Sequence, residues 1–207
     1  MEFVDIAFVI AVVIFSVIVH EVMHGVAADR LGDPTARYAG RLTLNPIPHL
    51  DLFGSIIIPI LLAVSQSPIF FGWAKPVPYN PYNLRQGRFS EAIVAFAGPL
   101  SNLVIALVAG IAVRVASAPM ADILFTVVLV NVMLFLFNLI PVPPLDGSKV
   151  LEALLPSGIR GAFSAWRGRM ETNPFLGMGI VILFIVLLGG QFGSIVFSLA
   201  RFVAGAA

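Results

Sequence analysis

Charge is scarce in this sequence, and cysteine is absent. Only 11% of the 207 residues are Asp, Glu, Lys or Arg, and 59% are hydrophobic, whereas soluble domains contain about 25% charged and about 45–50% apolar residues. This composition indicates an integral membrane protein. The lack of cysteine excludes a cysteine-ligated zinc site. A net charge of +1, with no basic run, argues against a nucleic-acid partner.

Long apolar runs predict an all-α, polytopic membrane protein. A membrane-spanning helix needs about 20 mostly apolar residues, and three runs clearly reach this length, at 3–28, 90–116 and 122–140. Residues 174–190 form a slightly short further run, and 191–207 predict either a last span or a helix in the membrane interface. We expect the first three spans to form the core.

The stretch between the first two spans predicts a small β or re-entrant insertion. Polar and apolar residues alternate over 41–45, as they do in a short strand. Residues 53–71 are apolar, but prolines and polar residues interrupt them. We expect this segment to make no net crossing: it either enters the membrane and returns, or lies as a hairpin against the core. The closely spaced prolines of 71–85 exclude a helix there.

The charges that flank the first apolar run predict its orientation. Glu2 and Asp5 lie at the N-terminal end of the run, which is too long for a signal peptide, and Arg30, Arg37 and Arg41 follow it. Basic residues prefer the cytosolic side of a membrane. The C-terminal end of the first span is therefore predicted to face the cytosol.

The first apolar run ends on HEVMH, which fits the pattern H-E-x-x-H. On a helix, His20 and His24 lie on one face and can hold one metal ion. Glu21 lies about 100° further around, where it can take a proton from metal-bound water. Ionised side chains at mid-bilayer cost roughly 2.5–3.5 kcal/mol each. Because that cost needs a compensating role, we interpret the motif as a metal site, for which imidazoles suit zinc.

A catalytic zinc ion usually has three protein ligands and one open position, so a third ligand must lie elsewhere. The candidates are His49 and Asp146. His49 is nearer in sequence, whereas Asp146 follows the third span behind a run of prolines. The charge of Asp146 would offset a dication better than a third neutral imidazole does. This favours Asp146 as the ligand and His49 as a neighbour, although Asp146 could instead cap the helix that follows it.

Two widely separated motifs resemble those of the site-2 proteases, the intramembrane zinc metalloproteases. HEVMH is followed at a distance by NLIPVPPLDG at 138–147, and AGPLSN at 97–102 lies between them. The stretches LNPIPHLD and FGWAKPVPYNP are similar to the small bacterial and archaeal branch of that family. The resemblance covers the chain from about residue 3 to residue 155.

The resemblance implies one Zn²⁺ per chain, held by His20, His24 and Asp146. It implies that Glu21 is the catalytic base. It further implies that Asn138 holds the substrate carbonyl or the developing oxyanion. The chain then divides into a protease core at 1–155 and a C-terminal part at 156–207, which contains a basic amphipathic segment and one or two membrane helices.

The function implied is hydrolysis of peptide bonds within or near the membrane helices of single-span proteins. The site would face the cytosol from a multi-pass position in the plasma membrane, with the lipid bilayer as its surroundings. An unwound substrate could pair with the edge of the strand predicted at 41–45. Two other classes remain open, a membrane metal-ion transporter and a catalytically silent protein that binds and regulates helices. The sequence gives no expectation for the oligomeric state.

Overall fold

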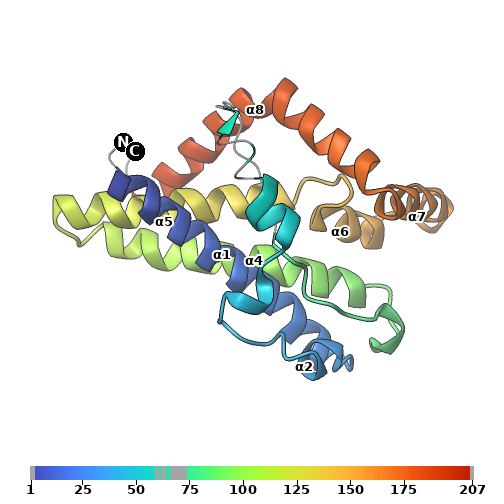
Figure 1. The fold of residues 1–207 in the computed structure, drawn as a ribbon. Helices are drawn as coiled ribbons and strands as arrows, with labels where there is room; N and C mark the ends of the chain where they lie inside the picture. The colour runs from blue at the N-terminus through green and yellow to red at the C-terminus, as the bar shows by residue number, and fades with distance from the viewer. Residues whose placement is uncertain (1–2, 59–60, 62–63, 66–73, 206–207) are drawn as a thin grey trace.

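The chain folds into helices joined by irregular segments. The computed structural model describes residues 3–58, 61, 64–65 and 74–205, and these residues contain no strand (Figure 1). In this described part of the chain, four helices are long and apolar enough to cross a membrane. They are α1 (Phe3–Arg30), α4 (Ser90–Val113), α5 (Ala118–Asn138) and α8 (Pro174–Ala204). The prediction of an all-helical chain with several spans is confirmed.

Shorter helices fill the connections on one side of these spans. Between α1 and α4 lie α2 (Thr35–Tyr38), η1 (Ile47–His49), η2 (Leu52–Ile57) and η3 (Pro81–Asn83). Between α5 and α8 lie α6 (Asp146–Leu154) and α7 (Ser157–Thr172).

Helix α4 is central, because it packs against α1, α5, α6 and α8. Its buried residues are mostly small, and they include Ala92, Ala95, Gly98, Ser101, Asn102, Ala106, Ala109 and Gly110. Small residues let helix backbones approach closely inside a membrane. Valine and alanine side chains form the apolar cluster where α4, α5 and α8 meet, among them Ala106, Val128, Val132, Val196 and Ala200.

The C-terminal apolar stretch forms one helix rather than two segments. Helix α8 runs from Pro174 to Ala204 without interruption, so of the one or two C-terminal membrane helices predicted the structure has one, and the division at residue 190 is wrong. The predicted division fell at Gly190, but glycine is tolerated within membrane helices. Figure 1 shows that α8 bends along its length.

The strand predicted at 41–45 is also wrong. Residues 42 and 43 form a bend and the others are irregular, and local side-chain contacts take the place of a strand ladder. The backbone N–H of Asn45 donates to Thr43 Oγ1 (3.2 Å), and the His49 ring contacts the Thr43 carbonyl (2.9 Å). Arg41 donates to the carbonyl of Lys75 (2.8 Å). Such contacts compete with regular structure, and the alternation over five residues was too short to outweigh them.

The re-entrant segment predicted at 53–71 is described only in part. Its first residues belong to η2, a wide helical turn that Asp51 caps by accepting from the N–H groups of Phe53 (3.1 Å) and Gly54 (2.7 Å). Much of the rest lies outside the described residues, so the re-entrant path stays a prediction. Residues 74–80 form no helix, as the prolines predicted, but residues 81–83 form the short 3-10 helix η3, so the exclusion of a helix over 71–85 is only partly confirmed.

The topology gathers several helix ends at one end of the molecule. The C-terminal ends of α1 and α5 lie there, with the N-terminal end of α4 and the whole of α6 (Figure 1). The two chain termini lie at the opposite end, near the connection between α4 and α5. Side chains from the ends of α1, α5 and α6 can therefore meet in one place.

Candidate metal centre

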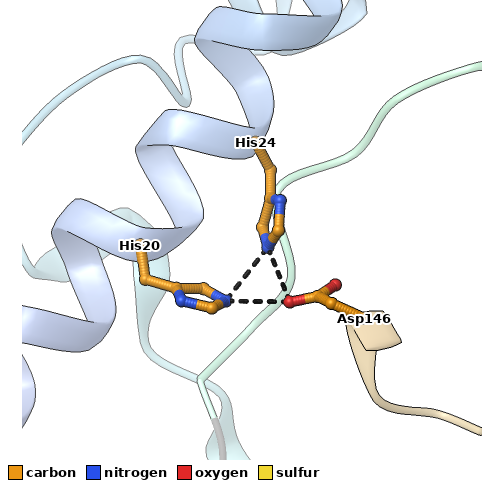
Figure 2. Close-up of side chains that lie close together, drawn as sticks. All are labelled: His20, His24 and Asp146. Atoms are coloured by element: carbon orange, nitrogen blue, oxygen red, sulfur yellow. Dashed lines mark hydrogen bonds and ion pairs between the residues drawn. The ribbon is translucent and has the colours of Figure 1, made fainter. Parts of the chain in front are cut away.

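Three of the predicted site residues converge at this end of the molecule. His20 and His24 project from the same face of α1 toward Asp146, the first residue of α6 (Figure 2). The two Nε2 atoms lie 3.0 Å apart, and Asp146 Oδ2 lies 3.2 Å from His20 Nε2 and 3.3 Å from His24 Nε2. The structure thus brings Asp146, and not His49, to the histidine pair.

The Nδ1 atoms of both histidines, which point away from the cluster, have partners that define where the ring protons lie. His24 Nδ1 is 2.8 Å from the carbonyl oxygen of Val94, and His20 Nδ1 is 2.7 Å from Asn102 Oδ1. Because a carbonyl oxygen can only accept, each Nδ1 must carry a proton. In the neutral rings both Nε2 atoms then present lone pairs toward each other and toward a carboxylate. Three such atoms are stable this close together when a cation lies among them.

A glycine keeps the space beside this cluster free. A Cβ atom at Gly98 of α4 would lie 2.5 Å from His24 Nε2 and 2.7 Å from His20 Nε2. Real side chains do not approach that closely, so any other residue would displace the rings or fill the space for an ion. Two imidazoles and one carboxylate, with room for a further ligand, are a donor set that suits catalytic zinc.

Asp146 reaches the cluster because α6 begins unusually close to the end of α5. A Cβ atom at Gly147 would collide with the carbonyl of Leu139, so glycine permits this approach. Asp146 Oδ2 faces the Nε2 atoms of both rings, so with the protons on Nδ1 the carboxylate and the two imidazoles present lone pairs to one another. Among the described residues the carboxylate makes no helix-capping hydrogen bond, so the capping role considered from the sequence is not observed.

Glu21 faces the same cavity as the cluster. The cavity has a volume of about 310 Å³, and its lining includes His20, Glu21, His24, Val77, Tyr79, Asn138, Asp146, Lys149 and Glu171. Glu21 Oε2 accepts a hydrogen bond from the backbone N–H of Val77 (2.8 Å). This bond fixes one carboxylate oxygen, and the irregular segment that contains Val77 forms one wall of the cavity.

Asn138 also lines the cavity, at the C-terminal end of α5. One of its amide hydrogens donates to the carbonyl of Leu134 in the same helix (2.9 Å). Among the described residues its amide oxygen and its second N–H have no other protein hydrogen-bond partner. Asn138 is therefore in position to contact a substrate, and its catalytic role stays a prediction.

His49 occupies a different place. Its side chain is only 2% exposed and contacts the Thr43 carbonyl, while its own carbonyl accepts from the N–H of Lys75 (2.9 Å). It lines neither the metal cluster nor the cavity described above. The residue therefore joins two irregular segments of the insertion, as a neighbour of the site rather than a part of it.

The sequence did not predict that Lys149 lies in the wall of the cavity. Lys149 donates to the hydroxyl of Tyr79 (2.9 Å), which in turn donates to Glu91 (3.3 Å). Burial raises the pKa of Tyr79, so its phenol stays neutral. A usable indication was present, because Lys149 is three residues after Asp146 and residues at that spacing share a helix face.

Four apolar spans and a buried His–His–Asp cluster define a metal-dependent membrane enzyme. The chain belongs to peptidase family M50, the family of the site-2 proteases. The family model, described as peptidase family M50, matches residues 112–188. The resemblance stated from the motifs is confirmed.

Similar proteins come from several bacteria. The chain is 36% identical over 193 residues to YwhC of Bacillus subtilis strain 168, which is named as a candidate zinc metalloprotease, and the match covers 88% of this chain and 82% of YwhC. Two proteins with the same kind of name are Rip2 of Mycolicibacterium smegmatis and Rip2 of Mycobacterium tuberculosis strain H37Rv. The first is 31% identical over 148 residues, which cover 70% of this chain and 56% of that protein. The second is 28% identical over 194 residues, which cover 91% of this chain and 71% of that protein. No solved structure matches at a significant level.

The fold, the cluster and the family agree on one class of enzyme. The chain is a multi-pass membrane protein and an intramembrane zinc metalloprotease, with Zn²⁺ as its cofactor.

Proposed function

We propose that this chain is an endopeptidase of the HExxH type that cleaves single-span membrane proteins within or near their membrane helices. The observation that carries the proposal is the convergence of His20, His24 and Asp146 beside a cavity that Glu21 also lines. His20, His24 and Asp146 would hold the zinc ion. Neither transport nor passive helix binding requires a carboxylate base beside a three-ligand metal site.

The residues of the cavity divide the chemistry between them. Bound zinc would act as a Lewis acid and lower the pKa of a bound water to about 7. Glu21 takes the proton of the attacking water and later delivers it to the leaving amine. The N–H of Val77 holds one oxygen of Glu21, so the other is free for this transfer. Asn138 donates its free N–H to the oxygen of the substrate carbonyl as negative charge develops there.

The fold favours a supply of water to this reaction. The cluster lies toward the ends of α1 and α5 rather than at their centres, and polar side chains, among them Lys149 and Glu171, line the cavity. A substrate helix hides its carbonyls in its own hydrogen bonds, so it must unwind to enter. We infer that α1, α4 and α5, together with α6, form the protease core of 1–155, and that 156–207 belong to a separate C-terminal part.

The distribution of charge supports a cytosolic active site in the plasma membrane. All lysines and arginines except Arg114 and Arg201 lie in the segments at the active-site end of the spans. Basic residues in short loops prefer the cytosolic side. The remaining two lie near the C-terminal ends of α4 and α8, at the other end.

Single cysteines test this orientation directly, because the chain has none of its own. Gln86→Cys should react with a membrane-impermeant maleimide only from the cytosolic side, and Ser117→Cys, in the connection between α4 and α5, only from outside. Both side chains are exposed, so accessibility does not limit labelling. Labelling of Gln86→Cys from outside in intact cells would reverse the proposed orientation.

Zinc dependence of cleavage tests the proposed function itself. The protein, reconstituted in lipid vesicles with a synthetic single-span peptide labelled at both ends, should cut the peptide. A chelator should lower the rate by at least about 10²-fold, since the Lewis acid is lost, and added Zn²⁺ should restore it. Zinc binding without cleavage of any of a set of single-span peptides would favour the silent regulator, and zinc uptake into the vesicles would favour the transporter.

A further inference from the structure

Three polar side chains lie deep in the apolar core, one from each of three spans. Ser16 of α1 is 2% exposed, and Asn102 of α4 and Asn131 of α5 are fully buried. An unsatisfied polar group inside a membrane protein costs several kcal/mol. Such residues therefore need partners, and their partners show what they do.

The amide hydrogens of both asparagines are fully used. Asn102 Nδ2 donates to Asn131 Oδ1 (3.0 Å) and to the backbone carbonyl of Ser16 (3.3 Å). Asn131 Nδ2 donates to Ser16 Oγ (2.9 Å) and to the carbonyl of Val127 (2.9 Å). Because backbone carbonyls only accept, the nitrogen of each amide must point toward them. The orientation of Asn102 is thus determined by groups on α1 and α5.

This orientation leaves Asn102 Oδ1 facing His20 Nδ1 at 2.7 Å. An amide oxygen accepts, so His20 must carry its proton on Nδ1 and present the lone pair of Nε2 to the cluster. His24 obtains the same tautomer from the backbone carbonyl of Val94, which no substitution removes. The two imidazoles therefore differ, because only His20 depends on a side chain.

We propose that Asn102, oriented by Asn131 and Ser16, is a positioning residue that fixes the tautomer and ring orientation of His20 for zinc. The inference rests on the zinc site proposed above. It gives the buried polar network a function beyond helix packing, since hydrogen bonds from α1 and α5 orient the Asn102 side chain that contacts His20. Outer partners of metal-binding histidines typically contribute 10–100-fold to metal affinity.

The test compares Asn102→Leu and Asn102→Asp with Ser101→Ala. Leucine has a similar size but accepts no hydrogen bond, whereas aspartate keeps an oxygen that faces His20. Ser101 is a buried neighbour on α4 whose hydroxyl donates to the carbonyl of Gly98 (2.6 Å), away from either histidine Nδ1. Zinc affinity is measured in detergent by competition with a chromophoric chelator. We expect a loss of about 10–100-fold for Asn102→Leu, a clearly smaller loss for Asn102→Asp and none for Ser101→Ala.

A second measurement reads the tautomer without zinc. The chain contains three histidines, so ¹⁵N-histidine labelling and single substitutions assign their ring nitrogens in the metal-free protein. His20 should be protonated on Nδ1 in the wild type and should become a mixture of tautomers in Asn102→Leu. His24 should not change.

The outcomes separate this inference from the proposed function. If the wild type binds no zinc, the proposed function fails, and the tautomer of His20 still decides the role of Asn102. Wild-type affinity in Asn102→Leu, an equal loss in Ser101→Ala, or an unchanged His20 tautomer would each overturn the inference. Should Asn102→Leu fail to fold, Asn131→Leu leaves the acceptor Asn102 in place but removes its orienting partner, and it should weaken zinc binding by a smaller factor.

Discussion

Glu21→Gln is expected to bind zinc as tightly as the wild type and to cleave a single-span peptide about 10²–10⁴-fold more slowly. The amide cannot take a proton from water, so the general base is lost. It keeps an oxygen that can accept from the N–H of Val77, as Glu21 Oε2 does now. The wall of the cavity should therefore stay in place. Zinc content and initial cleavage rates, measured on the same preparation in lipid vesicles, check both parts of this expectation.

Glu152→Gln is a matched control for this substitution. It makes the same chemical change at a glutamate that pairs with Arg167 (2.6 Å) and does not line the cavity. We expect its zinc content and its cleavage rate to stay near those of the wild type. A cleavage rate near the wild-type value in Glu21→Gln would refute the mechanism. Loss of zinc from Glu21→Gln would show instead that Glu21 is a ligand.

The local pattern of the sequence was sufficient for the histidine pair and for the spans. Spacing of four residues on a helix places His20 and His24 on one face whatever surrounds them. The third member of the cluster, Asp146, followed from its charge and from its position after a span, which are also local properties. Length and hydropathy predicted α1, α4 and α5 for the same reason.

The features that were missed depend on contacts between distant segments. Asn102 lies 82 positions from His20 in the sequence, and no local pattern shows that its amide meets the ring. The irregular backbone at 41–45 is held by contacts with His49 and Lys75, whereas the alternation of residue types predicted a strand. The continuity of α8 through Gly189 and Gly190 depends on the membrane environment, in which glycine breaks helices less readily. The division at residue 155 stays a prediction.

The largest expected effect on zinc binding comes from Asp146. Asp146→Ala should lower zinc affinity by several orders of magnitude and abolish cleavage, because it removes one of three ligands and the only charged one. Asp146→Asn should also abolish cleavage, with a smaller loss of zinc, since a neutral amide oxygen offsets a dication less well than a carboxylate does. An aspartate carboxyl ordinarily has a pKa of about 3.9, so the carboxylate is ionised well above that pH, and these losses should not depend on pH between about 6 and 8.

His49→Ala is the comparison that decides between the two candidates raised by the sequence. It should leave zinc affinity within about threefold of the wild type, because the ring contacts the Thr43 carbonyl and lies outside the cluster. It should also destabilise the insertion by about 1–3 kcal/mol, since a buried carbonyl loses its partner, and turnover should slow as the segment around Val77 loosens. Zinc at full occupancy in Asp146→Ala together with zinc lost from His49→Ala would reverse the assignment. The charge argument for the third ligand would then be wrong, and the insertion would belong to the metal site rather than support it.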